Sequence, residues 1–375
     1  MTIRRLRGNA YKLATIVYER AFLRASAALA LGVFVVCGLW AGVAAAGSGV
    51  APVSVAVSAG GVRVSTVPGR GTTLRSIACV SRTRCYAAGL LPSGAGAIVP
   101  VVAGRPERTV KVDGAGLEGI SCAGPGTCEA VGETGRSQLA AVVPVMDGHP
   151  GPVTKVGKGV YVLQDVSCVS AGVCEAVGGD QGVLVQTVDG TPSESQGVPG
   201  IGDFASISCA SAADCEAVGN GIDTLDGSYA SVSDGTPTVT RREPDQIALQ
   251  AISCPTADTC EAAGGFAYPH RHEAVIATVN DGTLGTPHVL ANLGISSAIA
   301  CPTATTCYAL VVPRGRSEDA RTVLVSIVNG RAGAERSLPD VLDSIACPST
   351  NLCYASGNEP TRPSDGVVVT VPVTS

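Results

Sequence analysis

The chain repeats one short stretch seven times, and each copy holds two cysteines with five residues between them. The clearest copy is LQDVSCVSAGVCEAVG at 163–178. The other copies begin at Leu74, Leu117, Phe204, Leu249, Ser296 and Leu342. The first cysteines of successive copies are 41 to 47 residues apart. A repeat of this length with strand-like content in every unit is typical of a β-propeller, in which each unit forms one blade.

Each unit contains four segments with the character of β-strands. Leu-x-x-Ile-Ser/Ala-Cys is the first, and Cys-x-Ala-Val-Gly follows as the second after a polar turn. A third apolar segment ends in Asp-Gly or Asn-Gly, as at 142–148, 183–190, 275–282 and 323–330. These dipeptides favour hairpin turns because both turn positions need positive φ. A weaker fourth segment follows, such as 287–293. Four antiparallel strands per unit predict an all-β, seven-bladed propeller over residues 50–375.

The two ends of the repeat region predict how the ring closes. The chain ends soon after the third segment of its last unit, 366–373, so that unit lacks an outer strand. Residues 52–69 also resemble strands and are free to supply it. This closure would remove the open sheet edges that promote aggregation. A small residue precedes every first cysteine, as expected where inner strands crowd near an axis. These residues are Ala78, Ser121, Ser167, Ser208, Ser253, Ala300 and Ala346.

Fourteen of the fifteen cysteines lie in the repeats, and the remaining one is Cys37. The pairs have no histidine nearby to complete a four-coordinate zinc site, whereas regularly paired cysteines in an exported chain form disulfides. Cross-strand neighbours lie ~4.5–5.5 Å apart, while packed sheets lie ~10 Å apart, so pairing within units is favoured. The predicted disulfides are Cys79–Cys85, Cys122–Cys128, Cys168–Cys174, Cys209–Cys215, Cys254–Cys260, Cys301–Cys307 and Cys347–Cys353.

The N-terminus predicts export. Residues 1–26 hold six Lys or Arg against one acid, and an apolar run follows at 27–46. Twenty residues suffice to span a bilayer, with the basic segment in the cytoplasm and the propeller outside. We therefore expect a single-pass membrane anchor. The alternative is a signal peptide cleaved near Ala46, after which the propeller is secreted. Cys37 has no small-residue lipoprotein pattern before it, and we expect an apolar cysteine in a helix.

The charge of the chain argues against nucleic acid as a partner. Residues after the N-terminal segment hold 20 of the 26 bases but 30 of the 31 acids. An acidic body without a basic stripe does not fit a phosphate backbone. Phosphate-binding and nucleophile motifs are also missing from the sequence, so we expect neither a cofactor nor catalytic residues.

Two groups of polar residues are candidates for metal binding. The aspartates of the Asp-Gly turns could act as cation ligands, but turn geometry accounts for them: Asp147, Asp189, Asp234 and Asp281. His270, His272 and Glu273 form a short cluster in a variable loop. Two histidines and a carboxylate could bind zinc, but the sequence identifies no further ligand to complete the site. We therefore predict no metal site, and we expect a solvated loop at 270–273.

The residue after each second cysteine is the third candidate, because its identity is ordered around the ring. Units two to five carry Glu129, Glu175, Glu216 and Glu261. Units six, seven and one, which become neighbours when the ring closes, carry Tyr308, Tyr354 and Tyr86. A binding rim with an acidic arc and an aromatic arc is one interpretation. Packing between blades, with repeat copies resembling one another by descent, is the other.

The pattern L-x-x-I-S-C, C-x-A-V-G and V-x-T-V-D-G resembles the BNR/sialidase-type repeat propellers, including photosystem II assembly-factor-like proteins of bacteria. The resemblance covers residues 50–375 and implies a bacterial propeller. Two departures matter: aromatic residues usually occupy the positions of the paired cysteines, and the Asp-box tryptophan of sialidases is missing here. No catalytic residue therefore carries over.

Together these features predict an envelope-associated binding or scaffold module for an unknown protein or glycan, rather than an enzyme. One alternative is a glycan-acting enzyme, which needs arginine, tyrosine and carboxylates clustered at the axis. Arg75 is the one arginine in the seven Leu-x-x-Ile-Ser/Ala-Cys segments and their equivalents, which disfavours this alternative. The other alternative, an assembly factor for a membrane complex, rests on the resemblance alone.

Overall fold

The computed structural model describes residues 55–57, 61–135, 138–179, 181–222, 226–242, 247–266, 273–280, 282–290, 293–313, 321–362 and 365–373. The predictions for residues 1–46, for His270 and His272 and for Asp281 lie outside these ranges. Val50–Ser375 form one compact unit. Within the described ranges, no helix has the length and apolar character needed to cross a membrane.

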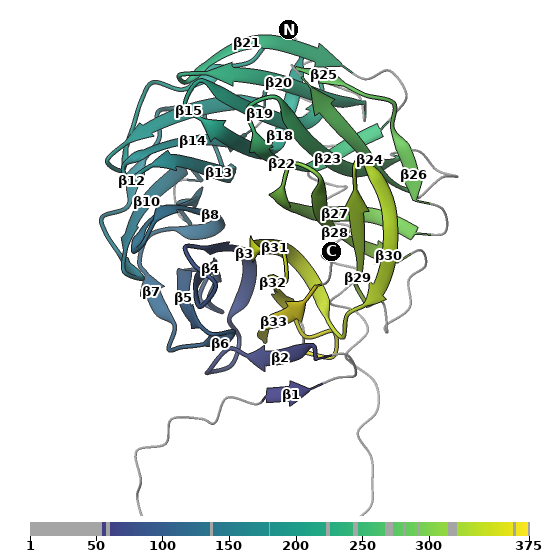
Figure 1. The fold of residues 1–375 in the computed structure, drawn as a ribbon. Coiled ribbons are helices and arrows are strands. Elements are labelled where there is room, and N and C mark those ends of the chain that lie inside the picture. Colours follow the sequence, from purple (N-terminus) through teal and green to yellow (C-terminus); the bar gives the residue numbers. More distant parts are fainter. Residues whose placement is uncertain are drawn as a thin grey trace, which may run out of the picture. The chain divides into compact units, whose positions relative to one another are not determined.

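Seven antiparallel sheets form a ring, so the prediction of an all-β, seven-bladed propeller is confirmed (Figure 1). The first strands surround the centre of the ring: β3 (Thr73–Cys79), β8 (Gly116–Gly124), β13 (Leu163–Ser170), β18 (Ile201–Ser211), β22 (Ile247–Thr256), β27 (Leu293–Thr303) and β31 (Val341–Ser349). The second strands are β4 (Arg84–Leu90), β9 (Thr127–Glu133), β14 (Val173–Gly178), β19 (Asp214–Gly221), β23 (Thr259–Phe266), β28 (Thr306–Pro313) and β32 (Leu352–Asn358). The third strands are β5 (Gly96–Val102), β10 (Ala140–Met146), β15 (Val183–Val188), β20 (Gly227–Ser233), β24 (Ala274–Asn280), β29 (Val323–Val328) and β33 (Gly366–Pro372).

The fourth strand is weak in most units, as its sequence predicts. It is continuous in unit four, as β21 (Thr236–Arg242), and in unit six, as β30 (Arg331–Ser337). In units one, two, three and five it is split into short pieces that both pair with the third strand: β6 (Arg105–Pro106) and β7 (Val110–Val112), β11 (His149–Pro150) and β12 (Thr154–Lys155), β16 (Thr191–Pro192) and β17 (Gln196–Gly197), β25 (Thr283–Leu284) and β26 (His288–Leu290). Proline ends three of these pieces, and it cannot donate to a sheet ladder.

The N-terminal strands close the ring, as predicted. β33 pairs with β2 (Arg63–Thr66), which in turn pairs with β1 (Val55–Val57). Val64 lies opposite Val369 in this ladder. The seventh sheet therefore combines strands from both ends of the repeat region, and the two ends hold each other in place.

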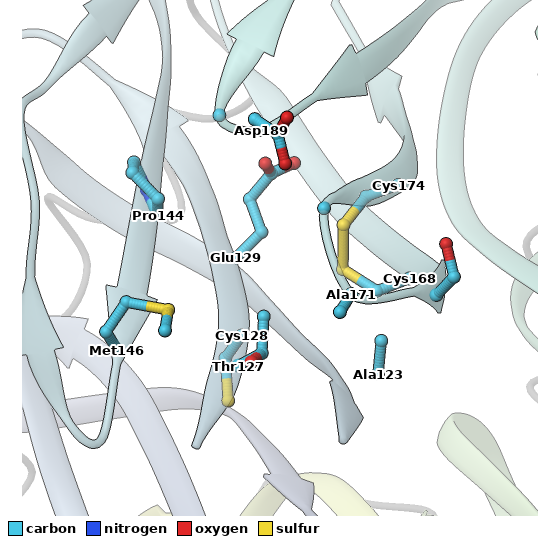
Figure 2. Close-up of a pocket in the computed structure, with 13 residues that line it drawn as sticks. Ala123, Thr127, Cys128, Glu129, Pro144, Met146, Cys168, Ala171, Cys174 and Asp189 are labelled. Carbon is cyan, nitrogen blue, oxygen red and sulfur yellow. A yellow bond between two sulfur atoms is a disulfide. The ribbon is translucent and has the colours of Figure 1, made fainter. Parts of the chain in front are cut away.

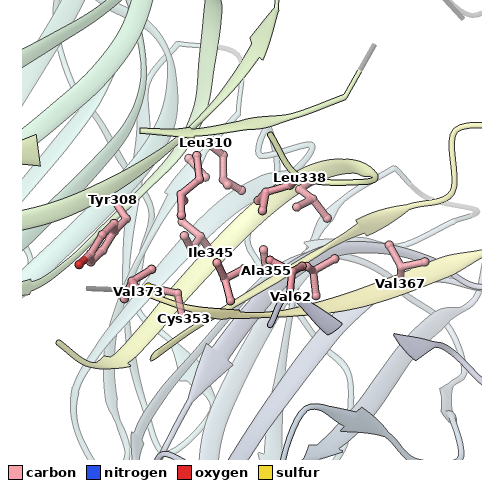
Figure 3. Packing of buried hydrophobic residues seen from close by; sticks show 14 residues of the cluster. Val62, Tyr308, Leu310, Leu338, Ile345, Cys353, Ala355, Val367 and Val373 are labelled. Atoms are coloured by element: carbon pink, nitrogen blue, oxygen red, sulfur yellow. The ribbon is translucent and has the colours of Figure 1, made fainter. Parts of the chain in front are cut away.

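The apolar core is divided among the junctions between neighbouring units. Each of the seven buried clusters joins side chains from two adjacent sheets. At the junction of units six and seven, Leu310 and Leu338 meet Ile345 and Val367 (Figure 3). Small and branched aliphatic residues make up most of these clusters, and five of the seven also include a buried aromatic side chain: Tyr86, Phe204, Tyr229, Tyr308 or Tyr354. Burial of this apolar surface is the main stabilising contribution to the ring.

Every first strand carries a β-bulge at the same position. In unit one Leu74 pairs with Gly89 and Ser76 with Ala88, so Arg75 has no partner in the ladder. The equivalent residues are Glu118, Gln164, Ala205, Gln250, Ser297 and Asp343. The bulge brings the two backbones together, and a Cβ on Gly89 would lie 1.9 Å from the Thr73 carbonyl oxygen. This contact explains the glycine of Cys-x-Ala-Val-Gly.

The serines before the first cysteines connect neighbouring units. The amide of Cys168 donates to Ser121 Oγ at 3.0 Å, and that of Cys209 to Ser167 Oγ at 3.0 Å. Ser208 and Ser253 accept from Cys254 and Cys301 in the same way, at 2.9 Å and 3.0 Å. The serines are small, as crowding near the axis predicts. Their hydroxyl groups also accept hydrogen bonds from the next unit, which the sequence did not predict. Alanine replaces serine in units six, seven and one, where it cannot accept such a bond.

The turns between third and fourth strands have the predicted geometry. Asp147 and Gly148 have φ values of 50° and 81°, as a two-residue hairpin turn requires. Asp189, Asp234 and Asn329, each followed by glycine, repeat this conformation. Unit one forms the same turn with Ala103 at φ 49° and Gly104 at φ 78°. The sequence did not predict that turn, because alanine seldom adopts positive φ.

Candidate functional site

One end of the propeller, here named the Cys face, consists of two sets of turns. The first set is the residues between the paired cysteines, and the second is the Asp-Gly, Asn-Gly and Ala-Gly turns. Backbone bonds join the two sets: Asp147 N donates to Gly126 O at 2.7 Å, and Asp189 N donates to Gly172 O at 2.6 Å. The two sets of turns therefore support each other at the same end of each unit.

Seven disulfides reinforce the Cys face, and they are the pairs that the repeat predicts. Their Cα atoms lie 3.9–4.0 Å apart, closer than the expected spacing of cross-strand neighbours. Each bond closes a turn of five residues, so every unit presents a constrained hairpin to this end of the ring.

The ordered glutamates and tyrosines lie in the junctions between units. Tyr86, Tyr308 and Tyr354 are 0–2% exposed, and Glu129, Glu175 and Glu261 are 0–5% exposed. Glu216 is partly buried. The structure thus shows packing between blades at this position, and the binding role suggested by the sequence stays a prediction for the set as a whole.

The tyrosines fill their junctions with aromatic rings. Tyr86 packs on the turn of the next unit, where a Cβ on Gly148 would lie 3.0 Å from Tyr86 Cε1. Tyr354 packs on Gly104 in the same way, and its hydroxyl donates to the Arg82 carbonyl oxygen at 2.7 Å. The hydroxyl of Tyr308 is buried and has no hydrogen-bond partner among the described residues.

Three glutamates accept hydrogen bonds from the residue opposite them on the third strand of their own unit. Gln186 Nε2 donates to Glu175 at 2.9 Å, Ser231 Oγ to Glu216 at 2.7 Å, and Thr278 Oγ1 to Glu261 at 3.0 Å. Burial raises the pKa of all three carboxyls, and these hydrogen bonds partly offset the effect.

Glu129 is different because the residue opposite it is Pro144, which has no donor. Its hydrogen bond comes instead from Thr187 Oγ1 of the next unit, at 2.6 Å. Burial raises the pKa of Glu129 to about 7, against the opposing effect of the Thr187 bond. This carboxyl is therefore held between two units, without a polar partner in its own sheet's third strand.

A cavity of about 340 Å³ lies beside Glu129, at the junction of units two and three. Figure 2 shows Pro144 and Met146 on one side of Glu129, the Cys168–Cys174 disulfide on the other and Asp189 above it. A second hollow, of about 370 Å³, lies over Gln186, Gln196 and Asp234 at the next junction, and polar residues and a glycine line it. The first cavity combines apolar walls with two carboxylates.

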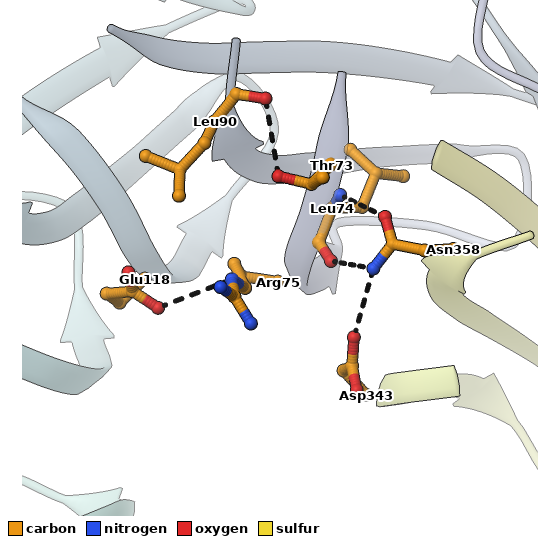
Figure 4. Close-up of polar contacts among 7 residues, drawn as sticks. All are labelled: Thr73, Leu74, Arg75, Leu90, Glu118, Asp343 and Asn358. Atoms are coloured by element: carbon orange, nitrogen blue, oxygen red, sulfur yellow. Dashed lines mark hydrogen bonds and ion pairs between the residues drawn. The ribbon is translucent and has the colours of Figure 1, made fainter. Parts of the chain in front are cut away.

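Charged residues also meet on the first strands of units seven, one and two (Figure 4). Arg75 Nε lies 3.7 Å from Glu118 Oε2, and Asn358 Nδ2 donates to Asp343 at 3.3 Å. Burial raises the pKa of Asp343 to about 6, while Arg75 and Asn358 lower it. All three charged residues occupy bulge positions. The sequence signal was a charge within the Leu-x-x-Ile segment, which sequence reasoning noted only for Arg75.

The metal candidates gain no support from the described residues. Asp147, Asp189 and Asp234 have the turn geometry that the sequence predicts. Glu273 is described, but its neighbours His270 and His272 lie outside the described residues. Among the residues described, no three His, Cys, Asp or Glu side chains gather as metal ligands would.

Comparisons with known proteins show the fold. No protein-family profile matches the chain, and no curated protein sequence matches it. A structure of YCF48 bound to D1 peptide is 12% identical, with a TM-score of 0.55, and covers 86% of this chain and 100% of its own. The WD40 propeller of Doa1 is 11% identical, with a TM-score of 0.57 over 82% of this chain and 95% of its own. The RRP9 WD40 repeats are 9% identical, with a TM-score of 0.63 over 86% and 100%. The chain thus shares its propeller fold with these proteins.

Proposed function

We propose that this chain is an exported, envelope-associated propeller that binds a protein partner through its Cys face. The observation that carries the proposal is the cavity between units two and three, which opens among turns held by disulfides and backbone bonds. A rigid set of turns around a hollow is a favourable binding surface, because little conformational entropy is lost when a partner docks.

The cysteine pairs and the N-terminal sequence support export. Disulfides persist outside the cytoplasm, and seven of them would be hard to maintain inside it. Residues 1–26 and 27–46 have the basic and apolar character of a membrane anchor, with cleavage near Ala46 and secretion as the alternative. The resemblance of the repeat to bacterial propellers supports a bacterial origin.

The likeness to the peptide-bound YCF48 structure supports a peptide or protein as the partner. An assembly role for a membrane complex is a form of the same proposal, since such a role requires protein binding. The glycan-acting alternative has less support: Arg75 is the only arginine among the seven bulge residues, and the ordered tyrosines are buried between units.

The export part of the proposal is tested with reporters fused to the C-terminus of the full chain. A reporter active only outside the cytoplasm should be active, and a reporter active only inside should be silent. The opposite pattern would rule out both export and the compartment that disulfides need.

The binding part is tested by site-specific photo-crosslinking of the full chain in its own membrane. A photoreactive residue at Met146 or Ala171 on the Cys face should yield a discrete crosslinked partner. The matched controls are Ser93 and Asp113, which lie in turns at the other end of unit one. Crosslinking at the controls and not at Met146 or Ala171 would place the binding surface on the opposite face and contradict the proposal.

A further inference from the structure

We propose that the cavity between units two and three is a pocket for a lysine or arginine side chain of a peptide. This inference rests on the proposed binding function and specifies the chemistry of the partner. It concerns one junction only, whereas the proposed function concerns the Cys face as a whole.

The charges around the cavity favour a cation. Glu129, which is 4% exposed, lies inside it, and Asp189 lines it from the turn of unit three. The thirteen residues that line the cavity include no lysine, arginine or histidine. Charge-assisted hydrogen bonds to a buried carboxylate are stronger than those between neutral groups. An ammonium or guanidinium group would therefore be held by Glu129, with Asp189 as a second acceptor nearby.

The walls suit the aliphatic part of the same side chains. Pro144, Met146 and Ala171 contribute apolar surface, together with the Cys168–Cys174 disulfide (Figure 2). Met146 is 56% exposed, so its side chain offers uncovered apolar surface at this site. Lysine and arginine bury a chain of methylene groups while presenting a charged end. A neutral apolar side chain would desolvate Glu129 without compensating its charge.

The space exists because of two residues at one junction. In units three, four and five the third strand supplies a side chain that bonds the glutamate: Gln186, Ser231 and Thr278. In unit one the third strand has Pro100, but Tyr86 occupies the place of the glutamate and is fully buried. Only unit two combines a glutamate with a proline, Glu129 with Pro144. The result is an acidic side chain beside an unfilled space.

The chain carries its own reporter for this pocket. It has two methionines, Met1 and Met146, so ¹³C-methyl labelling of methionine gives two signals from the full-length protein. A Met146→Leu variant assigns them. The probes are Nα-acetyl-lysine amide and Nα-acetyl-arginine amide, with the citrulline and norleucine amides as neutral analogues of similar length.

Three variants complete the design. Glu129→Gln removes the charge and keeps an acceptor for Thr187 Oγ1. Pro144→Gln places opposite Glu129 the amide that Gln186 provides in unit three, and it should fill the cavity while the carboxylate remains. Glu335→Gln, on the exposed outer strand β30 of unit six, is the control for the change in net charge.

We expect saturable shifts of the Met146 signal with the cationic probes and at least tenfold weaker binding of both neutral analogues. Glu129→Gln and Pro144→Gln should each weaken cationic binding at least tenfold, and Glu335→Gln should leave it unchanged. Selectivity below tenfold, or cationic selectivity that survives Glu129→Gln, would overturn the pocket. Because the photo-crosslinking test does not depend on the probe, a partner captured at Ala171 despite such a result would reject only the pocket and keep the proposed function.

Discussion

The two junctions on either side of unit two share the same framework, but one is filled by a side chain and the other contains a cavity. Tyr86 lies opposite Pro100 in unit one, and Glu129 lies opposite Pro144 in unit two. The tyrosine ring is fully buried against the next unit's turn, whereas the shorter glutamate leaves a cavity of about 340 Å³. These two junctions share the opposing proline, so the residue at one repeated position distinguishes the filled junction from the open one.

The filled junction favours stability, whereas the open junction favours binding. A buried tyrosine contributes apolar area and close contacts, while a buried carboxyl costs free energy unless it is protonated or paired. The tyrosines of units six, seven and one lie on the seventh sheet, in which strands from the two ends of the repeat region pair, and on the two sheets next to it. The glutamate junctions lie in the continuous part of the chain.

The largest expected effect comes from emptying the filled junction. Tyr86→Ala should lower the free energy of unfolding by about 3–5 kcal/mol, because a fully buried aromatic side chain is lost from a close-packed site. Glu129→Ala should cost about 1 kcal/mol or less, since the carboxyl it removes is costly to bury. Chemical denaturation of the full chain measures both. Equal losses would show that the two junctions are packed alike.

The second effect is a pH dependence specific to the open junction. The pKa of Glu129 is about 7 in the fold, above the ordinary value of 4.5, so the folded state binds this proton more tightly than the unfolded state. The associated stability is complete below pH ~4.5 and is lost as pH rises through ~7. Asp165, Asp340 and Asp343, each with a pKa raised to about 6, act in the same direction.

Glu129→Gln should therefore leave stability unchanged near pH 4.5 and raise it near pH 8, by up to about 3 kcal/mol. Thermal unfolding of both proteins across this range gives the comparison. A variant with the wild-type pH slope would mean that the Glu129 carboxyl is as well solvated as an exposed one.

A third effect distinguishes two tyrosines of the aromatic arc, Tyr354 and Tyr308. Tyr354→Phe should cost about 1 kcal/mol, because its hydroxyl donates to the Arg82 carbonyl oxygen at 2.7 Å. Tyr308→Phe should be neutral or slightly stabilising, since its buried hydroxyl has no partner among the described residues. Denaturation midpoints of the two variants should differ in this order. A larger loss from Tyr308→Phe would reveal a partner for that hydroxyl.

The smallest effect concerns the turns of units one and two. Ala103 has positive φ where the next unit has Asp147, and asparagine tolerates this conformation better than alanine. Ala103→Asn should raise the free energy of unfolding by about 0.5–1 kcal/mol, and Asp147→Ala should lower it by a similar amount. Differential scanning calorimetry resolves shifts of this size. A destabilised Ala103→Asn protein would contradict the assigned turn.

The sequence predicted the parts of this fold that a periodic pattern encodes. The spacing of the cysteine pairs gives the units, the Asp147-Gly148 type of dipeptide gives the turns, and the incomplete last unit gives the closure by residues 52–69. These features are local or repeat at a fixed interval, so one chain shows them several times.

Features that depend on contacts between units were not predictable in the same way. The burial of Glu129 depends on Pro144 in its own unit and Thr187 in the next. Pro144 stands at the variable position of the V-x-T-V-D-G motif, and the motif does not show that Thr187 contacts a neighbouring unit. The bulge at Arg75 and the acceptor role of Ser121 likewise depend on how neighbouring strands approach. The sequence does contain the proline, Pro144. Only the register of the second and third strands shows that it lies opposite Glu129.

Disulfide mapping of the natively expressed full chain tests the central claim of the account most directly, because the rigid Cys face and the export both depend on the seven pairs. Non-reducing proteolysis with mass spectrometry should recover each pair within its own unit, from Cys79–Cys85 through Cys347–Cys353. Free thiols at these positions would contradict export. Dominant bonds between units would contradict the stapled hairpins on which the binding face is built.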